Sequence, residues 1–192
     1  MASPKVLVFA GSIRTGALSG KLAALAAKEL AIADADVTRI SLADYPLPIY
    51  NGDLEAEKGI PENAVKLAKL IAAQQGVFIA TPEYNGSLPP LLKNTLDWVS
   101  RNRGGAQGIA FRNKAYAIGS TSDGLIGGAR ALIDCRKVVQ AGLGAILIPE
   151  KIEIGRAQDA FDETGELTVE PVSKLLKAVC RSLVNVSRQL AS

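Results

Sequence analysis

Residues 5–19, KVLVFAGSIRTGALS, contain a predicted buried strand, a polar loop and the start of a helix. Residues 5–10 form an almost continuous run of β-branched and other apolar residues, which predicts a strand buried on both faces. Over residues 18–33 the apolar positions recur at helical spacing, so a helix follows the strand directly. A strand that passes straight into a helix is typical of the first unit of an α/β sheet.

The rest of the chain continues this alternation. Further strands are predicted at residues 36–42, 77–81, 114–120 and 145–149, and further helices at residues 61–75, 90–100, 128–141 and 172–190. Five strands separated by helices predict a doubly wound α/β fold, with a parallel sheet covered on both faces. We expect residues 1–192 to form one domain, in which residues 150–171 are the only long irregular stretch and make a surface excursion or a subunit contact.

Composition and charge exclude several classes of protein. The 192 residues are 48% hydrophobic and 21% charged, which is ordinary for a globular domain and argues against disorder. The net charge of +3 is spread along the chain, so we expect no nucleic-acid partner. No apolar stretch approaches the roughly 18 to 20 residues that span a bilayer, and the first residues lack a signal-peptide pattern. We therefore expect no membrane association and a cytoplasmic location.

The chain contains no histidine, which limits its catalytic chemistry. A Ser-His-Asp triad, a Cys-His pair and a histidine-ligated zinc site are all excluded. The two cysteines, Cys135 and Cys180, have apolar neighbours at helical spacing and lack a metal-binding spacing, so we interpret both as small buried hydrophobic residues. We expect no metal site, and catalysis would rest on other groups or on a cofactor.

A loop that suits a phosphate group follows the first predicted strand. Residues 11–19 supply hydroxyls and one guanidinium just ahead of a helix N-terminus, where backbone N–H groups and partial positive charge are available. The loop has neither the Walker A pattern nor G-x-G-x-x-G, which disfavours a nicotinamide dinucleotide at this position. The simpler alternative is a turn in which Ser19 caps the helix.

Two further polar loops follow later strands. Residues 81–90 carry Tyr84 among turn residues, so a planar heterocycle could lie against its ring while loop amides meet the ring edge. Residues 120–130 contain three glycines and three hydroxyls, which allow a ligand to approach the backbone closely; the alternative is a flexible surface turn. In an open parallel sheet the ligand lies beyond the carboxyl ends of the strands. Three such loops at one end of a sheet favour a mononucleotide site.

These motifs resemble the NAD(P)H-dependent FMN reductase family, the flavodoxin-like group that includes bacterial quinone and chromate reductases. The resemblance covers essentially the whole chain and rests most on the Pro-Glu-Tyr-Asn run with its downstream Leu-Lys-Asn. The matching motifs are Gly11-Ser12-x-Arg14, Leu47-Pro48-Ile49-Tyr50-Asn51, Pro82-Glu83-Tyr84-Asn85, Leu92-Lys93-Asn94, Asp97-Trp98-x-Ser100-Arg101 and Gly127-Gly128-x-Arg130. The resemblance implies a five-stranded parallel sheet in the order 2-1-3-4-5, with helices on both faces.

The resemblance also implies an FMN site, carried over residue by residue. The residues implied to hold the phosphate are Ser12, Arg14 and Ser19. The residues implied to line or approach the isoalloxazine ring are Pro82, Glu83, Tyr84, Asn85, Ser120 and Gly124. The family usually has serine where Ala17 stands and often asparagine where Ser19 stands, so one phosphate donor is missing here and another is changed.

The activity that the resemblance implies is an FMN-dependent NAD(P)H oxidoreductase with no catalytic side chain, because the flavin carries the chemistry. NAD(P)H would give a hydride to the flavin and leave, and a quinone or another acceptor would then be reduced at the same face, in a ping-pong scheme. A homodimer or homotetramer is also implied, with subunit contacts near the flavin at Tyr84, Arg130 and Glu150. Two alternatives remain: a flavodoxin-like electron carrier without NAD(P)H activity, and a non-catalytic binding domain that has lost flavin.

Overall fold

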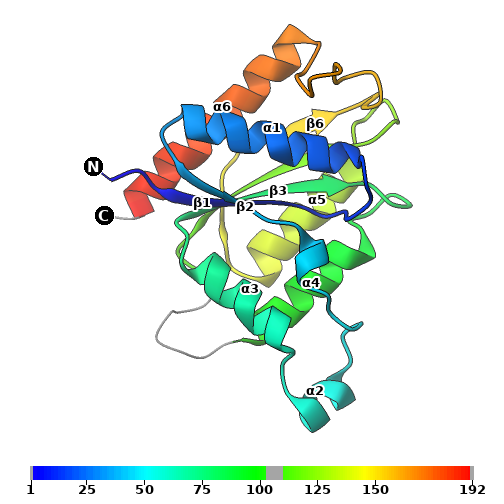
Figure 1. Ribbon diagram of the computed structural model, residues 1–192, viewed down its shortest axis with the longest axis vertical. Helices are drawn as coiled ribbons and strands as arrows, with labels where there is room; N and C mark the ends of the chain where they lie inside the picture. Colours follow the sequence, from blue (N-terminus) through cyan, green and yellow to red (C-terminus); the bar gives the residue numbers. More distant parts are fainter. Residues whose placement is uncertain (1, 103–109, 191–192) are drawn as a thin grey trace.

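A parallel β-sheet forms the centre of the protein in a computed structural model, which describes residues 2–102 and 110–190 (Figure 1). Its strands are β1 (Lys5–Ala10), β2 (Asp36–Arg39), β3 (Gly76–Pro82), β4 (Ala115–Thr121), β5 (Ile146–Leu147) and β6 (Ile152–Ile154). The strand order is β2-β1-β3-β4-β5, with β6 also paired to β4, and every pairing is parallel. The predicted doubly wound fold and the strand order implied by the resemblance are confirmed.

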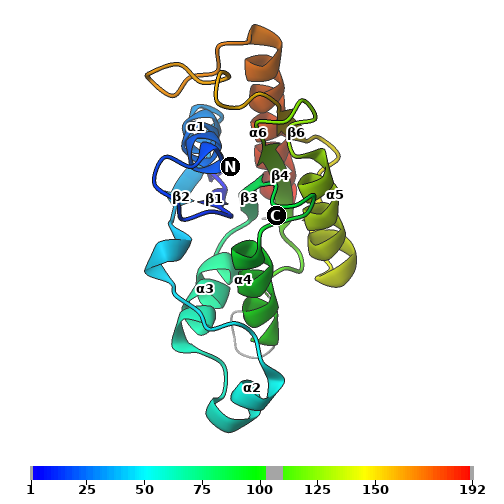
Figure 2. The same ribbon diagram turned by 90° about the vertical axis from the view of Figure 1, so that its right-hand side faces the viewer.

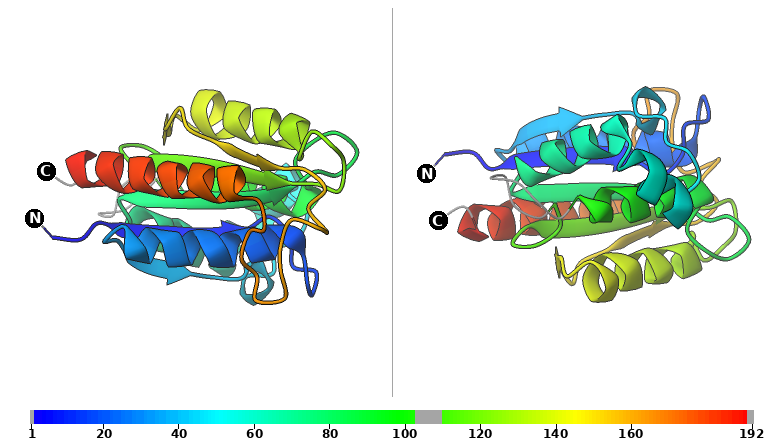
Figure 3. Two further views of the ribbon diagram at one scale, coloured as in Figure 1. Left: turned by 90° about the horizontal axis from the view of Figure 1, so that it is seen from above. Right: turned by 90° about the horizontal axis from the view of Figure 1, so that it is seen from below.

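Helices cover both faces of the sheet, as Figures 2 and 3 show. One face carries α1 (Leu18–Ile32) and α6 (Glu170–Leu190), and the other carries α3 (Glu62–Ala72), α4 (Pro90–Arg101) and α5 (Ala129–Lys137). Alternate residues of each strand point to opposite faces. In β1, Val6 and Val8 therefore pack in the cluster that contains α1 and α6, whereas Leu7 and Phe9 pack in the cluster that contains the other three helices.

The fifth position of the sheet differs from the prediction. Instead of one strand over residues 145–149, β5 pairs with the start of β4 and β6 pairs with its end. Pro149 lies between the two short strands, and a proline cannot donate a hydrogen bond to the strand ladder. Residues 150–171 are therefore not only a surface excursion, because Ile152 and Ile154 of β6 are buried in the core.

A second difference lies after β2, which ends at Arg39 rather than at residue 42. A short 3-10 helix, η1 (Leu42–Asp44), follows it. After a further loop comes α2 (Gly52–Lys58), which projects from the body of the protein (Figures 1 and 2). The side chain of Asn51 accepts hydrogen bonds from the first N–H groups of α2, which is the usual N-cap arrangement.

The other predicted helices are present, with small changes at their ends. The helix expected over residues 128–141 is α5 followed by a π-helical turn, η2 (Val138–Gly142). The C-terminal helix, α6, buries Leu176, Val179 and Leu183 and exposes basic residues on its opposite face. Among the described residues, no helix combines the length and the apolar character needed to cross a membrane.

Candidate functional site

The loops that follow β1, β3 and β4 meet at the carboxyl end of the sheet (Figure 3). They enclose a pocket of about 210 Å³. Most of the predicted site residues line it, namely Ser12, Arg14, Ser19, Pro82, Glu83 and Tyr84. The third loop contributes Thr121, Ser122 and Asp123, whereas Asn85, Ser120 and Gly124 lie outside the lining.

The first loop leads into the N-terminus of α1, where the N-cap residue makes no side-chain hydrogen bond. Ala17 occupies the N-cap position and carries no hydrogen-bonding group, so the alternative in which Ser19 caps the helix is wrong. Ser19 is instead inside the first turn and completely buried, and its Oγ has no hydrogen-bond partner among the described residues. A buried hydroxyl without a partner is rare because its desolvation is not compensated. Ser19 also belongs to the lining of the pocket.

The geometry of the first loop leaves room for an anion. The N–H of Ala17 donates to the carbonyl of Arg14 at 3.0 Å, and Gly16 between them has a φ of +71°, which glycine adopts without strain. The N–H of Arg14 donates to Ser12 Oγ at 3.3 Å. Since the first-turn N–H groups of a helix have no partner one turn earlier, they add donors and partial positive charge beside the Arg14 guanidinium. This donor set fits a phosphate monoester.

The second loop places Tyr84 at the rim of the pocket through a two-residue turn. Tyr84 and Ser87 exchange backbone hydrogen bonds of 3.0 and 3.1 Å, with Asn85 and Gly86 at φ values of 51° and 78° between them. Two positive φ values are the signature of a type I′ turn. The turn directs Asn85 away from the pocket lining and leaves the Tyr84 side chain 45% exposed beside it.

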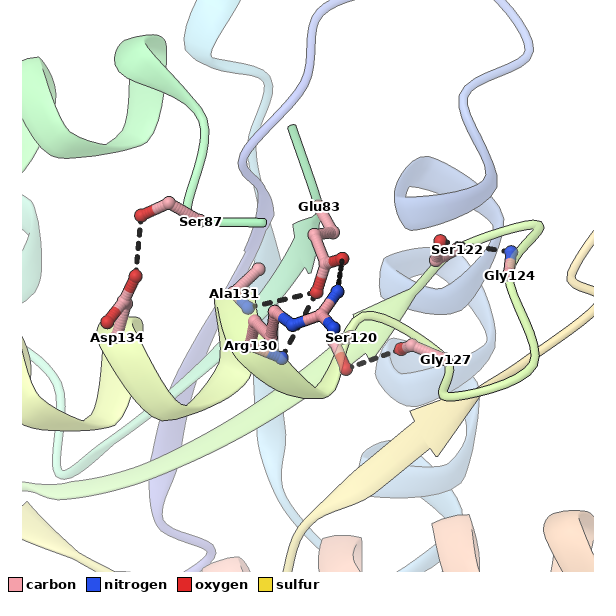
Figure 4. Close-up of polar contacts among 9 residues, drawn as sticks. All are labelled: Glu83, Ser87, Ser120, Ser122, Gly124, Gly127, Arg130, Ala131 and Asp134. Carbon is pink, nitrogen blue, oxygen red and sulfur yellow. Dashed lines mark hydrogen bonds and ion pairs between the residues drawn. The ribbon is translucent and has the colours of Figure 1, made fainter. Parts of the chain in front are cut away.

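Glu83 ties the second loop to α5 (Figure 4). Its Oε2 accepts hydrogen bonds from the backbone N–H groups of Arg130 at 3.1 Å and Ala131 at 3.2 Å. The N-cap position of this helix is Gly128, which has no side chain, so a carboxylate from another loop caps α5. The resemblance implied that Glu83 lines the flavin ring. Glu83 does belong to the pocket lining, but its carboxylate accepts hydrogen bonds from a helix 47 residues along the chain, and no local sequence pattern indicates such a contact.

A second contact reinforces the same connection. Ser87 Oγ donates to Asp134 Oδ2 at 2.6 Å, one turn further along α5 (Figure 4). The two contacts hold the loop on both sides of Tyr84, which fixes the position of its backbone relative to α5. Neither partner could be predicted from the sequence, because their spacing along the chain follows no helical or strand period.

The third loop uses its small residues mainly to pack. Ser120 is fully buried and its Oγ donates to the carbonyl of Gly127 at 2.7 Å, so this hydroxyl closes the loop and does not face the pocket. A Cβ on Gly127 would lie 2.8 Å from the backbone of Gly155, and the φ of Gly127 is +63°. At Gly127 the close approach is therefore to the segment after β6, and the approach of a ligand to this loop stays a prediction.

Both cysteines lie away from the pocket and are buried, as predicted. Burial raises the pKa of the Cys135 thiol to about 12 and also raises the pKa of Cys180. Neither forms a thiolate near neutral pH, so neither is a nucleophile.

A family model, curated relatives and solved structures all relate this chain to flavin-dependent or quinone reductases. Residues 4–159 match the model of the family described as NADPH-dependent FMN reductase. The chain is 35% identical over 165 residues to a quinone reductase of Escherichia coli (strain K12), covering 85% of this chain and 84% of that protein. It is 33% identical over 181 residues to an NAD(P)H-dependent FMN reductase of Pseudomonas aeruginosa, covering 93% and 92%. Among solved structures, FerB, a flavoenzyme NAD(P)H:(acceptor) oxidoreductase from Paracoccus denitrificans, superposes with a TM-score of 0.76 at 28% identity, covering 97% of this chain and 98% of that one.

Proposed function

The chain belongs to the NADPH-dependent FMN reductase family, and we propose that it binds FMN in the three-loop pocket and uses NAD(P)H to reduce a quinone-like acceptor. The observation that carries the proposed site is the buried Ser19 hydroxyl, which has no partner among the described residues and stands in the first turn of α1. A phosphate oxygen at this point would supply the missing partner.

The residues proposed to hold the phosphate are Ser12, Arg14 and Ser19. The two hydroxyls and the N–H groups of the first turn donate hydrogen bonds, and the guanidinium neutralises charge. Ala17 contributes no hydroxyl, so the buried Ser19 donor carries a larger share of the phosphate contacts than it would with a serine at position 17.

The residues proposed to hold the isoalloxazine ring come from the second and third loops. Pro82, Glu83 and Tyr84 line the pocket, with the tyrosine ring at its rim. Asn85, Ser120 and Gly124 lie beside the lining, so their proposed contribution is through backbone groups of the two loops. Glu83 keeps the second loop in place through its hydrogen bonds to α5.

FMN supplies the redox chemistry when bound, accepting a hydride from a nicotinamide and passing electrons to an acceptor. Reduction of a quinone by hydride needs one further proton, which solvent supplies, so the chain needs no side chain that takes or gives a proton. This agrees with a chain that contains no histidine. The backbone N–H groups of the second and third loops orient the cofactor and stabilise negative charge that develops beside it.

We further propose that NAD(P)H and the acceptor use the same open face in turn. Tyr84 lines the pocket and is 45% exposed, so we expect both substrates to enter beside this ring and to exclude each other. Such exclusion predicts ping-pong kinetics, with parallel lines in double-reciprocal plots at several fixed acceptor concentrations. Converging lines would show that both substrates bind together and would contradict a shared face.

A homodimer or homotetramer is part of the proposal. Leu125 and Ile126 in the third loop are 76% and 50% exposed, and they follow the pocket residue Asp123 in the chain. Ile133 in α5 is 59% exposed. Large apolar side chains exposed in this way are typical of a surface that another subunit covers. Sedimentation velocity of the purified protein would show the oligomeric state.

The test of the function is a visible spectrum of the purified protein with and without added FMN, followed by anaerobic addition of NADPH. We expect flavin absorbance that NADPH bleaches and that a quinone restores. Bound flavin that neither NADPH nor NADH reduces would support the electron carrier instead. Absence of flavin binding would support the non-catalytic binding domain and refute the proposed site.

A further inference from the structure

The side chain of Tyr84 links the second loop to the first. Its hydroxyl oxygen lies 3.5 Å from Ser12 Oγ, within hydrogen-bonding distance, and either hydroxyl can be the donor. Both residues line the pocket. The backbone of Tyr84 therefore belongs to the loop proposed to hold the isoalloxazine ring, whereas its hydroxyl reaches the site proposed for the phosphate.

The backbone that carries this side chain is fixed on both sides. Before Tyr84, the Glu83 carboxylate accepts hydrogen bonds from the first N–H groups of α5. After it, Ser87 donates to Asp134 of the same helix and exchanges two backbone hydrogen bonds with Tyr84. A tyrosine side chain turns about only two bonds, so a fixed backbone places its hydroxyl at a low cost in conformational entropy.

The hydroxyls of Ser12 and Tyr84 supply more hydrogens than the described residues accept. Ser12 Oγ accepts the N–H of Arg14 at 3.3 Å, which leaves the hydroxyl hydrogen of Ser12 available. Whichever of the two hydroxyls donates in their mutual contact, the hydrogen of the other has no acceptor among residues 2–102 and 110–190. An excess of donors beside the Arg14 guanidinium favours a ligand that only accepts hydrogen bonds and is negatively charged.

The two carboxylates of the pocket lining are occupied by other donors. Glu83 Oε2 accepts from the start of α5. Asp123 Oδ1 accepts the backbone N–H of Gln158 at 3.2 Å, and Asp123 Oδ2 accepts from Gln158 Nε2 at 2.8 Å. Within the described part of the chain, neither carboxylate forms a hydrogen bond with the hydroxyl of Ser12 or Tyr84. The spare hydroxyl hydrogen is therefore available to a ligand.

The helix end beside this contact lacks a hydroxyl at its N-cap. Ala17 is the N-cap residue of α1 and lines the pocket, but its side chain carries no donor. The Tyr84 hydroxyl reaches the same pocket from another loop. Because hydroxyl hydrogen bonds are about 2.7 to 2.8 Å long, two hydroxyls 3.5 Å apart can donate to one oxygen atom. Tyr84 and Ser12 can therefore act together on one atom of a ligand.

From these contacts, and on the basis of the proposed FMN site, we infer that the hydroxyl of Tyr84 is a phosphate ligand. It supplies, from the second loop, a donor that the first loop lacks at Ala17. FMN and riboflavin differ only in the phosphate, so Tyr84 is then a residue that makes the site select FMN over riboflavin. The binding is reversible, and no covalent bond changes.

The test measures the Kd of FMN and of riboflavin by quenching of flavin fluorescence, with the full chain in its FMN-free form. Tyr84→Phe keeps the ring and removes the hydroxyl. It should raise the Kd for FMN about tenfold, the loss of one hydrogen bond to a charged group, and leave the Kd for riboflavin within about twofold of the wild-type value. Tyr50→Phe is the matched control, because the Tyr50 hydroxyl donates to Glu55 at 2.9 Å outside the pocket lining, and neither Kd should change.

A further variant tests whether Tyr84 takes the place of a donor at position 17. Ala17→Ser in the Tyr84→Phe background should recover most of the lost affinity for FMN and leave the Kd for riboflavin unchanged. If the added serine recovers none of the affinity, the replacement of an N-cap donor by Tyr84 is refuted.

Two results with Tyr84→Phe would overturn the inference. One is an unchanged Kd for FMN, and the other is an equal increase for FMN and riboflavin, which would place the hydroxyl at the ring. A variant that binds riboflavin as tightly as the wild type is folded, so weaker binding of FMN alone is not a folding defect. The proposed reductase activity fails separately, if the wild type binds FMN that neither NADPH nor NADH reduces. A wild type that binds neither flavin would overturn the site and the inference together.

Discussion

Replacing Ser19 by alanine should have opposite effects on the FMN-free protein and on FMN binding. Ser19 Oγ is buried with no partner among the described residues, so in the free protein its desolvation is uncompensated. Burial of an unpartnered hydroxyl costs about 1 to 3 kcal/mol, and alanine is also the better helix former by a few tenths of a kcal/mol. Because the substitution leaves a small void, we expect Ser19→Ala to raise the free energy of unfolding of the FMN-free protein by about 1 kcal/mol.

FMN binding should weaken in the same variant. In the complex the hydroxyl would donate to a charged phosphate oxygen, and a hydrogen bond to a charged group contributes about 1.5 to 3 kcal/mol. The lower end of this range applies because the pocket has an open rim, and it corresponds to a roughly tenfold increase in the Kd for FMN. Urea unfolding of the FMN-free protein and quenching of flavin fluorescence on titration would measure the two effects separately.

Ser187→Ala is the matched control. Ser187 Oγ, in α6, is the other buried serine hydroxyl without a partner in the described part of the chain. It lies against Gly76, at the start of β3 and therefore at the opposite end of the sheet from the pocket. Its replacement should stabilise the FMN-free protein by a similar amount and leave the Kd for FMN unchanged. If Ser19→Ala destabilises the free protein, or binds FMN as tightly as the wild type, the assignment of Ser19 to the phosphate is refuted.

Three further predictions concern packing, capping and thiol chemistry. Glu83→Ala removes the acceptor of two N–H groups at the start of α5 and should lower the free energy of unfolding by about 1 to 2 kcal/mol, measured by urea unfolding. Glu83→Gln keeps an acceptor oxygen, so its free energy of unfolding should fall by about half as much. Gly119→Ala places a Cβ 2.9 Å from Leu22 Cδ2 in the core and should cost about 1 to 3 kcal/mol, measured by the same assay. Cys135 and Cys180 should resist alkylation by iodoacetamide at pH 8 in the folded protein and react fully after unfolding, which mass spectrometry would detect, because burial raises both pKa values.

Each of these predictions has an outcome that contradicts it. Wild-type stability in Glu83→Ala would show that the carboxylate does not cap α5. For Gly119, the control is Gly142→Ala, whose added Cβ would have no heavy atom within 4 Å, and equal stability of the two variants would refute the packing argument. Rapid labelling of either cysteine in the folded protein would mean that its surroundings open on the timescale of the assay.

Sequence patterns were sufficient for the elements that bury a continuous apolar face. The buried runs of β1, β3 and β4 predict parallel strands, and the helical spacing in α1, α3 and α6 predicts the helices that cover them. The location of the pocket follows from this arrangement, because the carboxyl ends of neighbouring parallel strands meet at one edge. Tyr84 and Ser19 could therefore be assigned to one pocket although 65 residues separate them in the printed sequence.

Features that depend on particular non-periodic contacts could not be predicted from the sequence. The capping of α5 by Glu83, the closure of the third loop by Ser120 and the pairing of β6 with β4 leave no periodic pattern. Each requires the core to have formed first, because only the packed sheet and helices bring these groups within hydrogen-bonding distance.

The sequence by itself thus determined the order of strands and helices along the chain, which follows from apolar periodicity. It also determined the edge of the sheet where the pocket lies, which follows from the geometry of parallel strands. Only the tertiary structure decided which polar groups face that pocket. Ser19 lacks a partner because the chain buries it there, whereas Ser120 already has one in Gly127. The two serines are chemically identical, and the difference between them arises from which backbone carbonyls the folded chain places within reach.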